Sequence, residues 1–455
     1  MNETKTNWFI TFLSKFSPKE FVALSVSILI SIPILIYGFA TPTEDDNQRG
    51  FTPIAATIPV YDTSGNRVQL FDTSFYISYE NNVNDVERAL VVEVLNEYLV
   101  PYHKLFDRHA DYFATPVANP LRPTIEEQAN TPRVHNLKMI NDHLGEEIEV
   151  DYPLYQLIEE SVRLSIKSAG YFNPFVGELT DLWTDLLGYE DYPSAYDPLV
   201  NVTMRNELER LVSFVPKTPE EIAETITLRE DPIHQKYYVT LNPFNGATPG
   251  DLSLTLGGIA KGYLTDVMKE VMNQNKLYRG YINGGSSSIT TLSDQYFGNP
   301  LTVNMASIYR DEDGKRELTP SFSFNRSDTY SMSTSGSYEG KLFVDESTGN
   351  QYLRNHILNP FTGYPANHSH QLVSVVSHEL SGTELEILST SLIVMSQAQG
   401  VAFIMENYTD IDFNIVYLRH ENDGYYLDRN TGFPGENSTY FHLEERYREN
   451  FLEIA

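Results

Sequence analysis

Apolar residues recur along the chain at spacings that fit helices in some stretches and strands in others. Helical spacing predicts amphipathic helices within 84–106, at 152–170 and at 382–400. In the first segment the helical spacing extends up to Pro101, and Gly170 is expected to end the second helix. These three helices are long enough to bury a substantial apolar face.

Strand-like stretches lie between these helices. Two strands around a Ser-Gly-Asn turn are predicted at 60–80, and a further strand is predicted at 237–241, after the segment 219–230. Strands and turns are also expected at 292–332, and more strands near 403–417. No internal repeat is visible. Strands and helices do not alternate steadily, which is typical of an α+β protein.

The apolar stretch nearest the N-terminus predicts a transmembrane helix. Residues 21–40 carry no charge, and their length is enough for a helix that crosses the hydrocarbon core of a bilayer. Lysines precede the stretch and acidic residues follow it, so the positive-inside rule places the N-terminus in the cytosol. The flanking charges are Lys5, Lys15, Lys19, Glu44, Asp45 and Asp46.

This reading divides the chain into four parts. We expect a cytoplasmic N-terminus at 1–20, an anchor at 21–40, a polar linker at 41–54 and an extracellular folded domain at 55–455. A signal peptide that is cleaved after its apolar run is the alternative to an uncleaved anchor.

The composition restricts the partners of this domain. The chain has 455 residues, a formal net charge of -30 and no cysteine. Its charge disfavours nucleic acid, and the lack of cysteine excludes disulfides, thiolate zinc sites and thiol nucleophiles. A polyanionic ligand would need a local cation or a metal ion.

Two glycine pairs provide such a local exception. In "LTLGGIAKG" (254–262), Gly257 and Gly258 lead from a predicted strand into a helix at 258–276, where free backbone N–H groups and the helix dipole favour an anion. Lys261 adds a mobile cation. In "INGG" (282–285), a strand runs into the second pair. The spacing matches neither a Rossmann nor a Walker motif, and a tight packing turn is the alternative.

Polar residues with possible chemistry follow in two later segments. Hydroxyl residues beside Gly336 in "SMSTSGSYE" (331–339) can donate hydrogen bonds to a phosphate or a ring edge. His356 is expected on a strand that ends at a Pro-x-Thr-Gly turn, where it could act as a general base. The alternatives are an ordinary polar turn and a structural histidine.

The helix predicted at 382–400 carries a possible metal site. Glu386 and Thr390 are four residues apart and share one face, with Ser389 beside them. A carboxylate and hydroxyl oxygens suit a hard cation such as Mg²⁺. A solvated helix face is the alternative.

Together these segments resemble the FAD:protein FMN transferase family, also called ApbE. The resemblance spans residues 65–420 and rests on blocks that occur in the family's order. These blocks are "GYFNPFVGELTDLW" (170–183), "LGGIAKGYLTD" (256–266), "INGGSSSI" (282–289), "STSGSYE" (333–339) with "HILNPFTGYP" (356–365), and "ELEILSTSLIVM" (384–395).

The resemblance implies a fold and a reaction. It implies a single large mixed-sheet catalytic domain that splits FAD in a Mg²⁺-dependent reaction, moves FMN onto a threonine hydroxyl of an acceptor protein, and releases AMP. The partners would be FAD, the acceptor protein and the membrane, with no nucleic acid. Two alternatives stay open: a cell-surface flavin-binding protein without transferase activity, and an FAD pyrophosphatase that gives FMN and AMP.

The resemblance also implies roles for individual residues. His356 would be the base for the acceptor threonine. The FAD site would be formed by Gly177, Glu178, Leu179, Thr255, Lys261, Gly284, Gly285, Ser335, Gly336 and Asn141. The metal would be bound by a backbone carbonyl between Gly258 and Ala260, by Glu386 and by Thr390, with Ser389 adjacent.

The sequence departs from the family pattern at two positions. Glu386 and Thr255 stand where the family usually has aspartate, so one carboxylate reaches further and another is absent. The stretch "NGATPG" (245–250) is similar to the family's acceptor sequence, but Asn245 replaces its serine or threonine, which indicates an ordinary loop.

Overall fold

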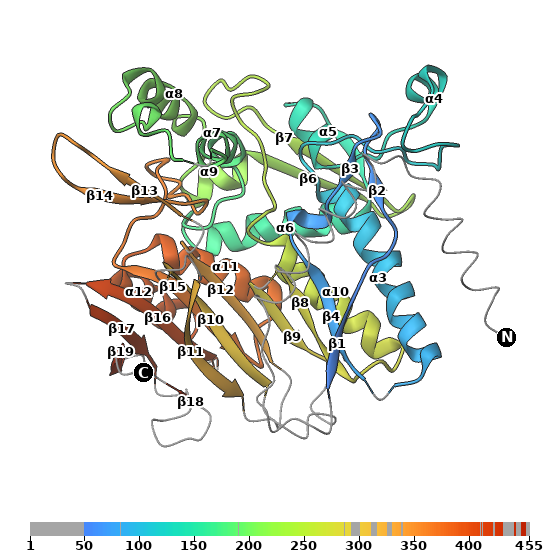
Figure 1. Cartoon of the computed structure of the whole chain (residues 1–455). Coiled ribbons are helices and arrows are strands. Elements are labelled where there is room, and N and C mark those ends of the chain that lie inside the picture. The colour runs from blue at the N-terminus through green and yellow to red at the C-terminus, as the bar shows by residue number, and fades with distance from the viewer. Residues whose placement is uncertain are drawn as a thin grey trace, which may run out of the picture. The chain divides into compact units, whose positions relative to one another are not determined.

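The structure is a computed structural model of the chain (Figure 1). It describes residues 50–451 except 82, 190, 286, 293–300, 311–315, 325–329, 338–339, 410, 412, 422–423, 431–440 and 443–446. The predicted membrane anchor at 21–40 lies outside the described residues. Within the described part, no helix is both long and apolar enough to cross a membrane.

A nine-stranded sheet forms the centre of the described residues. All of its neighbouring strands are antiparallel except the last pair, which is parallel. In spatial order the strands are β1 (Phe51–Ala55), β4 (Phe75–Glu80), β8 (Gly280–Gly284), β9 (Ser288–Thr291), β12 (Ser331–Gly336), β15 (His370–Ser377), β16 (Phe413–Glu421), β17 (Gly424–Arg429) and β19 (Tyr447–Phe451). Strand β1 begins before residue 55, so the fold includes the end of the predicted linker.

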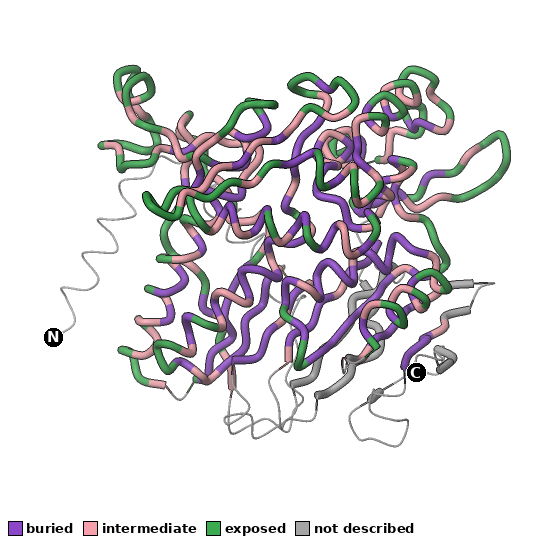
Figure 2. Tube along the Cα trace, turned by 180° about the vertical axis from the view of Figure 1, so that it is seen from behind, coloured by how far each residue is buried: buried purple, intermediate pink, exposed green. Residues whose placement is uncertain are grey.

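Three helices pack behind this sheet: α3 (Asp85–Phe106), α10 (Ala260–Gln274) and α11 (Gly382–Val394). Helix α10 contacts β8 and β9, and α11 contacts β12 and β15. Their apolar side chains join those of the strands in buried clusters. Figure 2 shows that buried residues run through the strands and these helices.

Smaller elements lie beside this central layer. The helices are α4 (Ile125–Asn130), α5 (Leu137–Asp142), α6 (Tyr152–Lys167), α7 (Gly177–Leu187), α8 (Val202–Val212), α9 (Pro219–Glu224) and α12 (Gln397–Asn407), with short 3₁₀ turns at Leu70–Asp72 and Ser194–Tyr196. The strands are β2 (Val60–Tyr61), β3 (Arg67–Val68), β5 (Ile148–Val150), β6 (Ile226–Asp231), β7 (Lys236–Leu241), β10 (Leu301–Arg310), β11 (Arg316–Phe324), β13 (Lys341–Val344), β14 (Gln351–Arg354) and β18 (Phe441–His442). The α+β prediction is confirmed.

The prediction that Pro101 ends its helix is wrong. Helix α3 continues to Phe106, with Pro101 inside it. Proline removes the hydrogen bond to the carbonyl of Glu97, but Glu97 is exposed, so water can replace the lost donor. Leu105 and Phe106 are buried in the core, and their packing keeps the last turn helical.

The single helix predicted at 382–400 is in fact two helices. Helix α11 ends at Val394, and α12 begins after Ser396, whose side chain forms a capping box with Gln399. The strand expected from residue 403 therefore begins only at Phe413. A local capping signal at Ser396 outweighed the continuous apolar pattern.

Candidate active site

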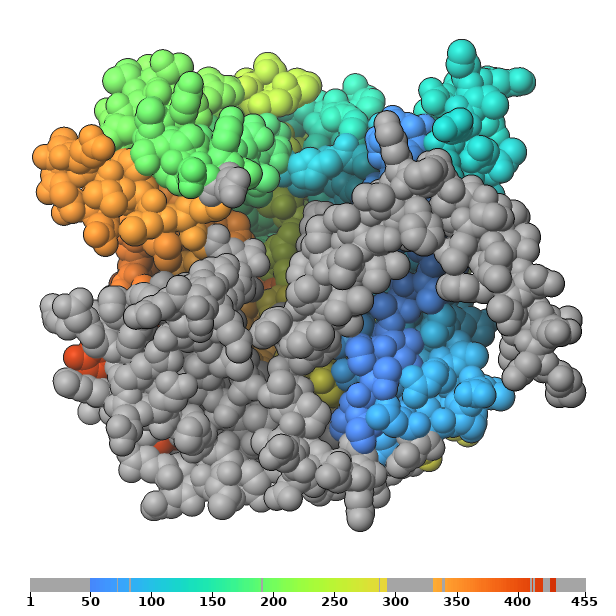
Figure 3. Space-filling model, viewed as in Figure 1, coloured from blue at the N-terminus to red at the C-terminus, as the bar shows by residue number. Residues whose placement is uncertain are grey.

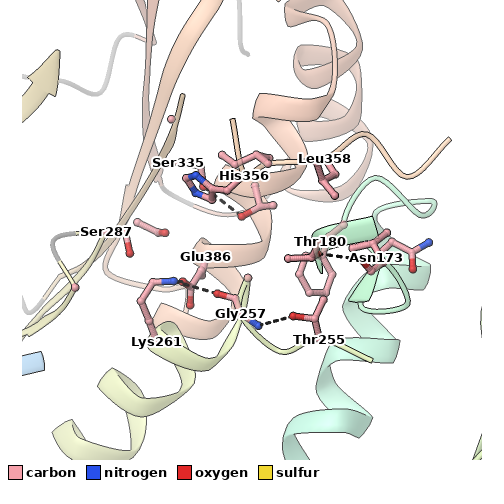
Figure 4. Close-up of a pocket in the computed structure, with 18 of the residues that line it drawn as sticks. Asn173, Thr180, Thr255, Gly257, Lys261, Ser287, Ser335, His356, Leu358 and Glu386 are labelled. Atoms are coloured by element: carbon pink, nitrogen blue, oxygen red, sulfur yellow. Dashed lines mark hydrogen bonds and ion pairs between the residues drawn. The ribbon is translucent and has the colours of Figure 1, made fainter. Parts of the chain in front are cut away.

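A cavity of about 380 Å³ opens where the predicted motifs meet (Figure 4). This volume is in the range of small-molecule sites. Within the described residues, its wall is made of Phe71, Thr73, Tyr171, Phe172, Asn173, Val176, Thr180, Thr255, Gly257, Gly258, Lys261, Gly285, Ser287, Ser333, Thr334, Ser335, Gly336, His356, Ile357, Leu358, Pro360, Glu386 and Thr390.

The first glycine pair forms the entry to α10. Both glycines line the cavity, and a Cβ atom on Gly258 would lie 3.1 Å from the Phe172 ring. The N-cap residue of α10, Ile259, has no side chain that could cap the helix. The turn therefore packs tightly and also presents a helix N-terminus, so the packing and anion-binding interpretations are compatible.

The strand predicted before this pair is absent. Residues 252–256 are an extended loop. The Asn141 side chain takes the place of a neighbouring strand, because it accepts the Leu254 N–H at 2.8 Å and donates to the Leu254 carbonyl at 3.0 Å. The Thr255 N–H donates to the Pro174 carbonyl at 2.7 Å. Asn141 thus supports the cavity wall from behind and is not among the residues that line it.

An ion pair lies at the junction of α10 and α11. Lys261 Nζ is 2.8 Å from Glu386 Oε1 and donates to the Gly257 carbonyl at 3.1 Å. The Glu386 carboxylate is almost fully buried, and its second oxygen accepts the Gly262 N–H. These contacts satisfy a carboxylate that would otherwise be costly to bury.

Close approach of the two helices brings this pair together. A Cβ atom on Gly262 would lie 2.3 Å from the Gly382 carbonyl oxygen, so the crossing requires glycine. Asp266 on α10 accepts the Gly382 and Thr383 N–H groups at 2.7 and 2.8 Å and so caps α11. Burial raises the pKa of Asp266. The sequence analysis missed Asp266, although it lies four residues after Gly262.

A cluster of hydroxyl groups joins α11 to strand β12. Ser335 Oγ lies 2.8 Å from Ser389 Oγ and 3.2 Å from Thr390 Oγ1, and Ser333 Oγ lies 3.1 Å from Ser389 Oγ. Ser389 is fully buried behind the wall, whereas Ser335 and Thr390 line the cavity. The Ser389 hydroxyl therefore orients the cavity hydroxyls.

The second glycine pair forms a turn at the end of β8. Gly285 lines the cavity with a φ of +68°, and a Cβ atom there would lie 2.4 Å from Thr73 Oγ1. Glycine is required on both counts. Gly284 is buried in β8 and is not among the lining residues.

His356 lines the cavity from a loop. The prediction that it lies on a strand is wrong, because β14 ends at Arg354 and His356 follows in a bend. The buried Arg354 guanidinium bonds to the Asp197 carboxylate at 2.7 and 3.0 Å. Trp183 Nε1 donates to the Gly363 carbonyl at 2.7 Å. These two contacts fix the loop at both ends (Figure 3 shows the β13–β14 hairpin, in orange, against the green α7–α8 region).

Several residues of the predicted FAD site lie outside the cavity wall. Leu179 packs with Trp183 in a buried cluster, and Gly177 is required because its Cβ atom would lie 2.3 Å from Ser253 Oγ. Glu178 and Ala260 are also absent from the lining residues. Val176, the N-cap residue of α7, and Thr180, one turn further along, line the cavity instead.

The cavity also contains polar residues that the sequence analysis missed. Asn173, Thr180 and Ser287 lie on its wall. Ser287 lies two residues after Gly285, and its position near that motif could have indicated it. Asn173 and Thr180 have no comparable local signal in the sequence.

The oxygen atoms at the α10–α11 junction fit a hard divalent cation. Glu386 offers a carboxylate, Ser335 and Thr390 offer hydroxyls, and Gly257 offers the carbonyl that now accepts from Lys261. Among the described residues, no group of three or more His, Cys, Asp or Glu side chains could hold a metal ion. The one carboxylate on the described part of the cavity wall is compatible with Mg²⁺, which commonly uses one or two carboxylates together with water and substrate phosphates.

The fold and the cavity define an α+β protein with a cavity that joins an ammonium, a carboxylate, an imidazole and several hydroxyls. A family model described as the ApbE family matches residues 120–414, more than half of the chain. The chain belongs to the ApbE family, and the family predicted from the sequence is confirmed.

Individual relatives agree with this assignment. The chain is 26% identical over 266 residues to an FAD:protein FMN transferase of Klebsiella pneumoniae. The aligned residues cover 58% of this chain and 69% of the relative. It is also 26% identical over 268 residues to an FAD:protein FMN transferase of Treponema pallidum. That alignment covers 57% of this chain and 64% of the relative. The solved structure of the flavin transferase ApbE from Vibrio cholerae shares the fold, with a TM-score of 0.53 and 17% identity, and the match covers 85% of this chain and 98% of that chain.

Proposed function

We propose that this protein transfers the FMN half of FAD to a threonine hydroxyl of another protein and releases AMP, with Mg²⁺ as cofactor. One observation carries the proposal. Among the described residues that line the cavity, Lys261, Glu386 and His356 are the only Lys or Arg, the only Asp or Glu, and the only His, respectively. The three residues that the chemistry requires thus face one space.

The charge of the chain makes the Lys261–Glu386 junction important. The protein has a formal net charge of -30, which opposes entry of the FAD pyrophosphate. Lys261 and the N-terminus of α10 supply positive potential at the cavity wall. Gly257, Gly285 and Ser335 leave room and donors for the phosphates and the adjoining ribityl chain.

The reaction is a phosphoryl transfer. The threonine oxygen bonds to the phosphorus of the FMN half, the bond from that phosphorus to the bridging oxygen breaks, and AMP leaves with the bridging oxygen. His356 accepts the threonine proton, because it lies at the cavity wall in a loop fixed by Arg354 and Trp183.

Glu386, Thr390 and Ser335 would hold the metal ion, with the Gly257 carbonyl beside them. When bound, Mg²⁺ supplies positive charge that stabilises the phosphate oxygens in the transition state. In the structure, the Lys261 ammonium neutralises the Glu386 carboxylate. The longer Glu386 keeps the carboxylate that the family usually provides from aspartate.

The proposal also places the catalytic domain outside the cell membrane. The apolar stretch 21–40 and the charges on either side of it support this location. The acceptor would then be a protein at the outer face of the membrane.

Mass spectrometry tests the function. The full-length chain in detergent is incubated with FAD, Mg²⁺ and a peptide that contains Thr-Gly-Ala-Thr, and a peptide with valine for the first threonine is the control. We expect an FMN adduct on the threonine peptide only, with one AMP for each adduct. AMP with FMN and no adduct would indicate a pyrophosphatase, and bound FAD with neither product would indicate a flavin-binding protein.

A further inference from the structure

Phe71 has an unusual backbone conformation at the cavity wall. Its φ is 53° and its ψ is 23°, in the left-handed region that bulky side chains rarely adopt. It lines the cavity together with Thr73. Strained conformations of this kind persist only where the surrounding structure holds them, and they concentrate at functional sites.

His103 of α3 holds this conformation. The Phe71 N–H donates to His103 Nδ1 at 3.1 Å, and the two rings meet edge to face at a centroid distance of 5.2 Å. His103 is buried, with 5% of its surface exposed. It is therefore a fixed acceptor within the core, directly behind the cavity wall.

Two further side chains determine which imidazole nitrogen carries the proton. The Tyr112 hydroxyl donates to Asp107 Oδ2, so its oxygen is available as the acceptor for His103 Nε2–H at 3.1 Å. Asp107 is itself fixed by the His109 and Ala110 N–H groups. With Nε2 protonated, Nδ1 keeps the lone pair that accepts the Phe71 N–H.

The other side of the segment is also held. The Gly285 N–H donates to the Ser74 carbonyl at 3.2 Å, and Thr73 packs where a Cβ atom on Gly285 would be. Residues 71–74 are thus fixed between α3 and the second glycine turn. The position of Phe71 at the cavity wall depends on both contacts.

We propose that His103 is a positioning residue for FAD: by accepting the Phe71 N–H, it keeps Phe71 in place at the cavity wall that faces the bound dinucleotide. This inference rests on the proposed function, which makes FAD the ligand of the cavity. His103 itself does not touch the ligand, because it is not among the residues that line the cavity.

Matched substitutions at residue 103 separate its two hydrogen bonds. In His103→Asn the side-chain oxygen lies at the level of Nδ1 and can still accept the Phe71 N–H. In His103→Gln the amide reaches Tyr112 instead. We expect His103→Gln to raise the FAD dissociation constant about three- to tenfold and His103→Asn to leave it near the wild-type value, as measured by flavin fluorescence polarisation on the full-length chain.

A double-mutant cycle shows whether His103 acts through Phe71. If it does, His103→Gln combined with Phe71→Ala weakens FAD binding no more than Phe71→Ala alone. Should His103→Gln fail to fold, Tyr112→Phe replaces it in the cycle, since it removes the hydroxyl that orients the imidazole. Additive effects, or equal losses in the Asn and Gln variants, would overturn the inference and leave the proposed function intact. A wild-type chain that does not bind FAD would overturn both.

Discussion

Two ion pairs in this protein differ in how completely they are enclosed. The Arg354 and Asp197 side chains are 2% and 0% exposed, and the guanidinium makes two hydrogen bonds to the carboxylate. Tyr192 O–H and Leu199 N–H also donate to Asp197. The guanidinium lies 5.0–5.5 Å from the ring centres of Trp183, Phe343, Tyr352 and Tyr364.

The Lys261–Glu386 pair is open on one side. Lys261 is 23% exposed and touches Glu386 at one oxygen, and both residues line the cavity. An arginine with its planar fork suits a fixed contact, whereas a lysine ammonium on a flexible stem can exchange partners. The enclosed pair therefore fixes the loop of His356, and the open pair can exchange Lys261 for a ligand or a metal ion.

The largest effect should come from the residue that the enclosed pair positions. His356→Ala should lower kcat by about 10²- to 10⁴-fold, because it removes the base that accepts the threonine proton. FAD binding should change little. Steady-state kinetics and FAD titration measure the two quantities. His234→Ala, an exposed histidine beside Asp231, is the matched control and should keep full activity. Equal losses of binding and turnover would reduce His356 to a structural role.

Substitution in the open pair should be nearly as damaging. Glu386→Gln should lower kcat by about 10²- to 10³-fold, because it removes the carboxylate that complements the cation. Calorimetric titration with Mg²⁺ in the presence of FAD should show a matching loss of affinity. Glu386→Asp should retain most activity, and Glu384→Gln on the same helix is the control. Unchanged Mg²⁺ affinity in Glu386→Gln would contradict the metal assignment.

Substitution in the enclosed pair should act on stability. Asp197→Asn should lower the free energy of unfolding by about 3–5 kcal/mol, since it leaves a buried guanidinium without its counter-charge. Denaturant unfolding measures this change. Glu147→Gln, which breaks the exposed pair with Arg229, should leave the transition almost unchanged. If Asp197→Asn changed the free energy of unfolding as little as Glu147→Gln does, the enclosed Arg354–Asp197 pair would not have the structural role proposed for it.

A smaller, pH-dependent effect is expected at the C-terminal end of α11, the helix of Glu386. The His370 Nε2–H donates to the Leu392 carbonyl at 3.1 Å, and burial with the nearby His368 lowers the pKa of His370 from 6.5 to about 4. Between these values the unfolded chain binds a proton that the native protein does not. Stability is therefore fully present above pH 6.5 and is lost as the pH falls towards 4.

Thermal unfolding across this pH range tests the role of His370. Glutamine does not titrate, so the free energy of unfolding of His370→Gln should fall less between pH 6.5 and 4 than that of the wild type, by roughly 3 kcal/mol. Parallel curves for the variant and the wild type would show that His370 does not contribute.

The candidate site was predicted best where a motif lies within one turn of chain. Lys261 lies three residues after Gly258, and Glu386 and Thr390 share one helical face, so local spacing was enough to find them. His356 was found in the same way, although its strand was not. The family resemblance then placed these motifs in one site.

Prediction failed where long-range packing selects a face. Spacing shows that Val176 and Thr180 share one side of α7 and that Leu179 and Trp183 share another, but only the buried cluster decides which side faces the cavity. The roles of Asn141 and Asp266 likewise depend on distant backbone groups, because Asn141 accepts the Leu254 N–H and Asp266 accepts the Gly382 N–H. Neither partner can be inferred from spacing.

The sequence by itself determined the family, the α+β class and the acidic character of the chain, and it singled out Lys261, Glu386 and His356, to which we assign the proposed chemistry. These features depend on residue identity and short-range geometry. Tertiary structure alone decided that Lys261 lies against Glu386, that Arg354 and Asp197 hold the His356 loop, and that His103 supports Phe71. Each of these contacts joins residues far apart in the chain, which only the packing of the helices against the sheet brings together.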